Sequence, residues 1–197
     1  MLVKYRVPYS GCYYDPKLRK HVTPKVPMAL QDAQRTISIV RAQAQELHID
    51  PNKIGVMGFS AGGNVAVLAS THLAKRSYAP IDSIDRVSLR PDFAIPVYPG
   101  HTTMHHQKNN GSRALNTDIV ISPDIPPTLL VHAQDDPVDP VHYSQVYAAA
   151  LKKAHLNATL KIYERGGHAF GVRKQGTDVD GWTKDVLIWL KQIKMLP

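Results

Sequence analysis

Three short segments of this 197-residue sequence carry side chains that could act together in acyl transfer. The first is GFSAGG at residues 58–63, with Ser60 near its centre. It matches the G-x-S-x-G pattern of a nucleophile elbow, in which a strained strand-to-helix turn presents the serine and requires small neighbours. The bare pattern also occurs in turns without chemistry, but here an apolar run precedes it and a helical pattern follows it. We therefore predict that Ser60 is a nucleophile.

The second segment, QDDPVDP at residues 134–140, is rich in carboxylates. It holds Asp135, Asp136 and Asp139 directly after an apolar run. A serine nucleophile works with a histidine, and a carboxylate is needed to orient that histidine and to stabilise its protonated form. Aspartates also form turns, so the residues themselves leave the choice among the three open.

The third segment, ERGGHAFG at residues 164–171, places His168 between glycines in a tight loop. A single histidine is more often structural than catalytic. However, His168 follows both the serine and the aspartates, and nucleophile, acid, histidine is the chain order that accompanies the elbow in α/β-hydrolases. The conjunction of the three segments therefore favours a catalytic triad.

Alternating strands and helices must position these segments. Apolar runs bounded by turn residues predict strands at 2–7, 54–59, 93–98, 128–133 and 158–163. Helical patterns follow at 29–47, 61–74, 141–154 and 180–193. The alternation predicts an α/β fold with a mostly parallel sheet and helices on both faces. Such sheets bind ligands at the carboxyl ends of their strands, which is where all three segments fall.

Composition and charge narrow the class of protein. The length suggests a single domain over residues 1–197, and the 43% hydrophobic content is ordinary for a globular protein. The net charge of +8 comes from scattered basic residues, so no nucleic-acid partner is expected. No apolar run approaches the ~18 residues of a membrane span, and no signal-peptide pattern is visible, so we expect no membrane partner and a cytoplasmic location. The single cysteine, Cys12, allows no intramolecular disulfide.

His101, His105 and His106 raise the question of a metal site. Zinc sites usually take three or four ligands, and no cysteine or carboxylate completes this set. We expect these residues to be loop histidines, and we expect no metal ion or other cofactor.

At this point the chain resembles a known family, the small bacterial α/β-hydrolases that include acetyl esterases, acetyl-xylan esterases and xylanase-associated esterases. The resemblance is carried by YRVP at 5–8, LQDAQR at 30–35, IDP at 49–51, IGVMGFSAGG at 54–63, PPT at 126–128, VHA at 131–133, DPV at 136–138 and GGHAFG at 166–171.

The resemblance implies roles for individual residues. The family places its acid directly before a Pro-Val or similar pair, which selects Asp136 from the three aspartates. It makes Ser60 the nucleophile and His168 the general base of a two-step acyl transfer. The Ala61 N–H would be one oxyanion donor. The implied activity is hydrolysis of short-chain carboxylic esters, including acetylated carbohydrates.

The sequence also departs from the family's pattern. Family members begin with further strands and a glycine-rich loop that supplies the second oxyanion donor, and no such motif precedes residue 5. We therefore expect an N-terminally truncated α/β-hydrolase fold that lacks the usual first strands, has a reduced cap insert at 99–126 and has weakened oxyanion stabilisation.

The missing part of the sheet predicts self-association. In the family's sheet the third strand lies between the fourth and the fifth, so its loss leaves a central gap. The expected strand at 2–7 must lie beside 54–59 or pair with another chain, because an unpaired strand edge invites association. We expect a homo-oligomer, a dimer or larger.

Two other functions are compatible with the same motifs. One is a catalytically weak or silent fragment or scaffold of a longer hydrolase, which the missing N-terminal part suggests. The other is a small peptidase of the prolyl-oligopeptidase kind, whose catalytic domains share the elbow and the chain order.

Overall fold

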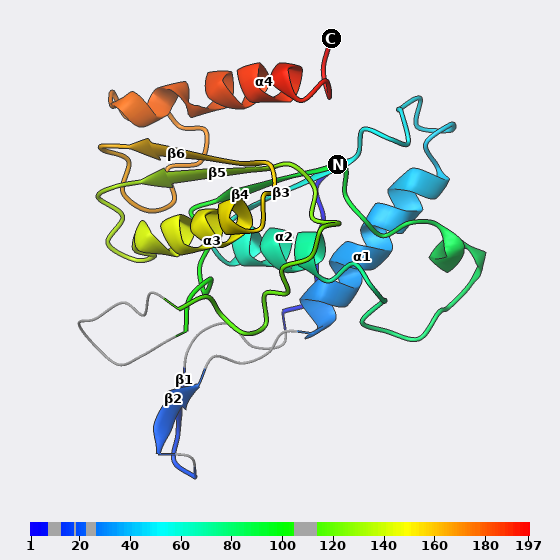
Figure 1. Ribbon diagram of the computed structural model, residues 1–197, viewed down its shortest axis with the longest axis horizontal. Helices are drawn as coiled ribbons and strands as arrows, with labels where there is room; N and C mark the ends of the chain where they lie inside the picture. The colour runs from blue at the N-terminus through cyan, green and yellow to red at the C-terminus, as the bar shows by residue number, and fades with distance from the viewer. Residues whose placement is uncertain (8–12, 18, 23–26, 105–113) are drawn as a thin grey trace.

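The computed structural model describes residues 1–7, 13–17, 19–22, 27–104 and 114–197 (Figure 1). Its centre is a parallel sheet with the strand order β3-β4-β5-β6. The strands are β3 at Gly55–Phe59, β4 at Phe93–Val97, β5 at Thr128–Ala133 and β6 at Ala158–Tyr163. Each lies within one residue of its predicted range, because short apolar runs between turn residues are a strong local signal.

Helices cover both faces of this sheet, which confirms the predicted α/β architecture. α4 at Trp182–Gln192 lies on one face, and α2 at Ala61–Thr71 and α3 at His142–Lys153 lie on the other (Figure 1). Side chains alternate along the fully buried β5. Leu129 and Val131 pack with Trp189 of α4, whereas Leu130 packs with Leu151 of α3. The sheet therefore lies between two apolar layers.

α1 at Pro27–Ala42 packs on α2 through small and branched apolar side chains of both helices. The helix ends five residues before its predicted limit, and this part of the prediction was wrong. The chain instead turns back: the Ile49 N–H donates to the Ala44 carbonyl at 2.9 Å, and His48 has a positive φ of 53°. This left-handed residue closes the turn that follows the helix, although the apolar spacing continues to residue 47.

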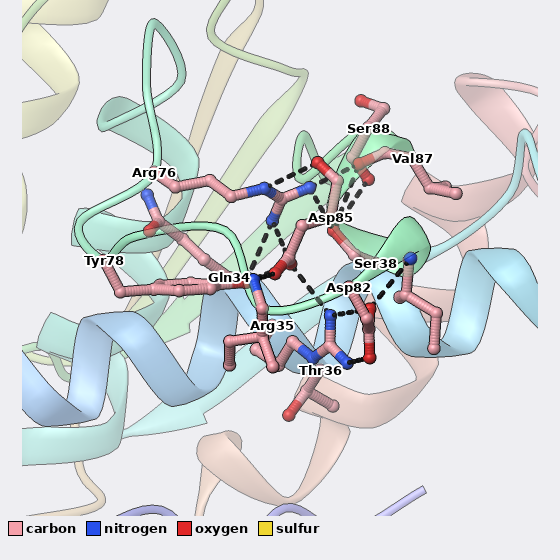
Figure 2. A network of polar contacts seen from close by, with 12 residues as sticks. Gln34, Arg35, Thr36, Ser38, Arg76, Tyr78, Asp82, Asp85, Val87 and Ser88 are labelled. Carbon is pink, nitrogen blue, oxygen red and sulfur yellow. Dashed lines mark hydrogen bonds and ion pairs between the residues drawn. The ribbon is translucent and has the colours of Figure 1, made fainter.

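A polar network fixes the connection between α2 and β4 against α1 (Figure 2). At its centre the Asp85 side chain, 1% exposed, accepts a 2.6 Å hydrogen bond from the Tyr78 hydroxyl and pairs with Arg35 at 2.9 Å. Burial opposes ionisation of Asp85, but these hydrogen bonds hold its pKa below the usual range. The Arg76 guanidinium donates to the Val87 carbonyl at 2.6 Å. The network orders the chain around η1 at Ser83–Arg86.

The predicted strand at 2–7 is not formed, and residues 1–7 run in an irregular path. The Arg6 N–H donates to the Asp32 carboxylate of α1 at 2.8 Å, and its guanidinium pairs with the same group at 2.7 Å. Tyr5 packs against the cluster between α1 and α2. These contacts hold the segment on the helices, so its backbone does not pair with β3.

A cavity of about 510 Å³ lies between this segment and the free edge of β3. Among the described residues, β3 pairs with β4 alone. The cavity is lined by residues 1–3, by β3 and by apolar side chains of α1 and α2. Met57 and Phe59 of β3 remain 45% and 37% exposed. This edge of β3 is therefore open and apolar within the described part of the chain.

The remaining elements are small. β1 at Tyr13–Asp15 and β2 at Lys20–Val22 form an antiparallel hairpin, and neither was among the predicted strands. η2 at Asp178–Gly181 precedes α4. The described parts of the 99–126 insert contain one isolated bridge, between Thr103 and Leu115. No helix in the described ranges has the length and apolar character to cross a bilayer.

Candidate active site

Ser60 lies in a sharp turn between the end of β3 and the start of α2. Its φ of 51° and ψ of −117° are strained for a residue with a side chain. Hydrogen bonds compensate: the Ser60 N–H donates to the Val97 carbonyl at 3.0 Å, and the Ser60 carbonyl accepts from Asn64 N–H at 3.0 Å. The strained turn presents the Ser60 hydroxyl at the carboxyl end of the sheet.

Two glycines make this turn possible. A Cβ at Gly58 would collide with the carbonyl of Gly62, and a Cβ at Gly63 would lie 3.0 Å from the Val97 carbonyl oxygen. Gly62 itself is less confined, because its Cβ would meet only the Tyr5 hydroxyl at 3.7 Å. The small-residue demand inferred from the sequence therefore holds for Gly58 and Gly63.

The structure brings Ser60, His168 and Asp136 together in one hydrogen-bonded chain. His168 Nε2 lies 3.0 Å from Ser60 Oγ, and His168 Nδ1 lies 2.8 Å from Asp136 Oδ2. The Asp136 side chain is 0% exposed and that of His168 is 17% exposed. The other carboxylate oxygen of Asp136 accepts from the Val138 and Asp139 N–H groups at 2.8 and 3.0 Å. This carboxylate is therefore fixed on both sides.

The other two aspartates of the segment have different contacts. Asp135 Oδ1 accepts hydrogen bonds from the N–H groups of Gly166 and Gly167 at 2.9 and 2.8 Å, so it binds the backbone of the histidine loop. Gly167 has a φ of 60°, which glycine adopts without strain. Asp135 thus holds the loop, while Asp136 contacts the imidazole.

Aromatic side chains support the histidine loop from the core. The Tyr98 ring centroid lies 5.0 Å from that of His168 and 4.6 Å from that of Phe170. The Trp182 indole N–H donates to the Gly171 carbonyl at 2.7 Å. Burial raises the pKa of the Tyr98 phenol. Tyr98 therefore borders the site as the end of its strand predicts, and Trp182 combines core packing with a hydrogen bond to this loop.

His132 is a residue of the site that reasoning from the motifs missed. It is fully buried on β5, and its Nε2 lies 2.7 Å from the Asp139 carbonyl oxygen and 3.5 Å from Asp136 Oδ2. Its Nδ1 lies 2.8 Å from Ser144 Oγ. Burial lowers the pKa of His132, so the neutral ring donates from Nε2 and accepts the Ser144 hydroxyl at Nδ1. The one available signal was a histidine inside an otherwise apolar strand.

Asp139 is the third carboxylate of the segment, and it also reaches the nucleophile. Its Oδ2 lies 3.4 Å from Ser60 Oγ and 3.9 Å from His168 Nε2. Burial raises the pKa of Asp139, although the nearby His168 opposes this shift. Ser60 therefore faces an imidazole and a second carboxylate.

Other predicted site residues have less definite surroundings. Ala61 is the first residue of α2, where helix N–H groups lack acceptors within the helix, and its role as an oxyanion donor stays a prediction. His105, His106 and Cys12 lie outside the described residues. Across the described part of the chain, no three histidine, cysteine or acidic side chains are grouped to hold a metal ion.

Two curated proteins are similar to this chain in sequence. The chain is 28% identical over 181 residues to an acetylxylan esterase of Xylanibacter ruminicola, covering 82% of this chain and 35% of that protein. It is 27% identical over 167 residues to endo-1,4-beta-xylanase B of Butyrivibrio fibrisolvens, covering 77% of this chain and 26% of that protein. The chain thus spans about a third or less of the length of these two curated relatives.

Solved structures resemble the fold over most of the chain. An acetyl ester-xyloside bifunctional hydrolase of Caldicellulosiruptor lactoaceticus superposes with a TM-score of 0.75 and 33% identity, covering 88% of this chain and 69% of that one. A thermophilic esterase of Thermogutta terrifontis superposes with a TM-score of 0.72 and 25% identity, and the match covers 88% of this chain and 66% of that one. Residues 28–195 match the prolyl oligopeptidase family. The chain therefore belongs to the prolyl oligopeptidase family and has an α/β-hydrolase fold of the acetyl-xylan esterase-like kind.

Proposed function

We propose that this chain is a serine ester hydrolase with Ser60 as nucleophile, His168 as general base and Asp136 as the acid that orients it. The observation that carries the proposal is the continuous chain from Ser60 Oγ through His168 to the buried Asp136, with distances of 3.0 and 2.8 Å. Both contacts are within hydrogen-bonding range.

The geometry accounts for each proton transfer. The His168 Nδ1–H donates to Asp136, which leaves the Nε2 lone pair to accept the Ser60 proton. Ser60 Oγ then attacks the ester carbonyl, and the imidazolium protonates the leaving alcohol. Water, deprotonated by His168, releases the acid from the acyl-enzyme. The Ala61 N–H at the start of α2 would donate to the oxyanion.

The proposed substrates are short-chain acyl esters, including acetyl groups on carbohydrates. Two relatives support this choice, since one is named an acetylxylan esterase and the other an acetyl ester-xyloside hydrolase. A peptidase activity is the second candidate, because the family that the chain matches is named for an oligopeptidase. The contacts among Ser60, His168 and Asp136 favour neither leaving group by themselves.

The two activities can be separated by rates on two chromogenic substrates. We expect hydrolysis of p-nitrophenyl acetate and little or no hydrolysis of an aminoacyl-prolyl p-nitroanilide of equal concentration. Faster cleavage of the anilide would replace the esterase proposal with the peptidase. Absence of both reactions, together with absence of fluorophosphonate labelling in folded protein, would favour a catalytically silent scaffold.

We also propose that the chain self-associates through the open edge of β3. Within the described ranges no strand pairs with this edge of β3. The exposed Met57 and Phe59 and the apolar cavity next to the edge support this choice of surface. A second copy would cover the edge. Light scattering over a dilution series should give a mass above that of one chain, and Met57→Lys should lower it. A monomer at all concentrations would contradict the proposal.

A further inference from the structure

A second carboxylate lies beside the nucleophile, and the Ser60–His168–Asp136 chain does not use it. Asp139 Oδ2 is 3.4 Å from Ser60 Oγ and 3.9 Å from His168 Nε2. Asp136 approaches the opposite nitrogen of the same imidazole at 2.8 Å. The ring therefore has a carboxylate at each end, and only one of them is needed to orient it.

The position of Asp139 is fixed by its surroundings. Its N–H donates to Asp136 Oδ1 at 3.0 Å, and its carbonyl accepts from His132 Nε2 at 2.7 Å. A Cβ at Gly100 would lie 3.1 and 3.2 Å from the two carboxylate oxygens, so glycine there leaves room for the group. The Asp139 side chain is 14% exposed. The carboxylate is thus held in place, and little of it faces water.

The position of the Asp139 carboxylate corresponds to the alcohol part of an ester substrate. In acyl transfer the leaving oxygen must come close to His168 Nε2, which protonates it. Asp139 Oδ2 is near both that nitrogen and Ser60 Oγ, so it lies beside the alcohol part of the ester. An ionised carboxylate accepts hydrogen bonds and donates none. The group it suits is a hydroxyl close to the ester oxygen.

We propose that Asp139 is a specificity-determining residue that accepts a hydrogen bond from a substrate hydroxyl on the carbon next to the ester-bearing carbon. This inference rests on the proposed esterase function and names its substrate class more closely: esters of sugars and other polyols. A site built to bind a hydroxyl rejects the analogue that lacks it, because its own polar group is then left unpaired. Alcohol parts that carry a negative charge are repelled.

A different role for Asp139 would have a different signature. From 3.9 Å it could instead stabilise protonated His168. That effect would act on every ester alike and would displace the pH dependence of kcat/KM. A hydrogen bond to the substrate changes the ratio between two esters instead. The test therefore compares two substrates, not one rate.

A suitable pair is 2-hydroxyethyl acetate and propyl acetate, which have nearly the same shape and differ in a terminal hydroxyl or methyl group. The kcat/KM ratio of the two should favour the hydroxylated ester in the wild-type chain. The ratio should fall roughly ten- to a hundredfold in Asp139→Ala, the range expected when a hydrogen bond to a charged group is lost. Asp139→Asn keeps a neutral acceptor, so its kcat/KM ratio should lie between those of wild type and Asp139→Ala. Asp124→Asn removes an equal charge at an exposed position and should leave the ratio unchanged.

The outcomes separate this inference from the proposed function. Circular dichroism first establishes that both Asp139 variants are folded. A wild-type ratio near one, an unchanged ratio in both variants, or an equal loss on both esters with a displaced pH profile would overturn the role of Asp139 while leaving the esterase intact. No hydrolysis of either ester and no fluorophosphonate labelling of wild type would instead remove the proposed function, and this inference with it.

Discussion

Asp135 and Asp136 are neighbours in the chain, yet they bind different parts of the same histidine loop. Asp136 Oδ2 lies 2.8 Å from His168 Nδ1, whereas Asp135 Oδ1 accepts the N–H groups of Gly166 and Gly167. Successive side chains at the end of a strand point in different directions, so one aspartate reaches the ring and the other the backbone behind it. The loop is held by two adjacent carboxylates with separable effects.

The first prediction concerns these two carboxylates. Asp136→Asn should lower kcat on p-nitrophenyl acetate by about 10⁴-fold, because an amide favours the wrong histidine tautomer. Asp135→Asn, at an exposed position, should cost about 1 kcal/mol of stability and much less activity. Steady-state kinetics and urea unfolding of both variants measure the difference. If Asp135→Asn abolished activity and Asp136→Asn did not, the assignment of the acid would be wrong.

The second prediction concerns His132 and pH. Burial lowers the pKa of His132 below its ordinary 6.5, so the folded chain keeps this ring neutral while the unfolded chain protonates it. The contribution of His132 to the free energy of unfolding is fully present above pH 6.5. It is lost as the pH falls from 6.5 toward the lowered pKa that His132 has in the folded chain. Between pH 7.5 and 5.5 the loss should reach up to about 1.4 kcal/mol.

His132→Asn should remove that part of the pH dependence, although its absolute stability will be lower because the Asp139 carbonyl loses its donor. His155→Gln, at an exposed histidine, should leave the pH dependence as in wild type. Urea unfolding at the two pH values measures both variants. Equal pH dependence in wild type and His132→Asn would show that His132 is not held neutral.

The third prediction concerns the elbow. Gly58→Ala should destabilise the chain by about 1–3 kcal/mol or prevent folding, because the new methyl group meets the rigid backbone of Gly62. Gly181→Ala is the matched control, since nothing lies within 4 Å of its added Cβ and its φ of −84° suits alanine. Thermal unfolding should separate the two variants. Equal midpoints would contradict the close contact between the strand and helix of the elbow.

Local patterns predicted the central fold well. Each of β3 to β6 is a short apolar run between turn residues, and such runs are typical of buried strands. The segment at 2–7 has the same local pattern but forms no strand. Contacts with other elements prevent the pairing. Asp32 of α1 binds the Arg6 backbone, and a cavity separates the segment from the edge of β3. Strand formation depends on such non-local contacts, which a single segment does not encode.

The site was predictable to the level of motifs but not of contacts. Chain order placed Ser60, the aspartates and His168 at one edge of the sheet, and the structure brings these groups together. The motifs did not indicate that Asp139 also reaches Ser60, because the turn after β5 sets the direction of each carboxylate. His132 was missed for a related reason: its role depends on Ser144 and the Asp139 carbonyl, which only the fold brings near it.

The central claim is that Ser60 is the nucleophile, and covalent labelling tests it most directly. Wild type should react with a fluorophosphonate probe to give one adduct, located at Ser60 by mass spectrometry, and should hydrolyse p-nitrophenyl acetate. Ser60→Ala should form no adduct, and its kcat should be lower by about 10⁶-fold. Ser83→Ala, at an exposed serine, should form the adduct and hydrolyse the ester as wild type does. Labelling and hydrolysis that persist undiminished in folded Ser60→Ala would contradict the account.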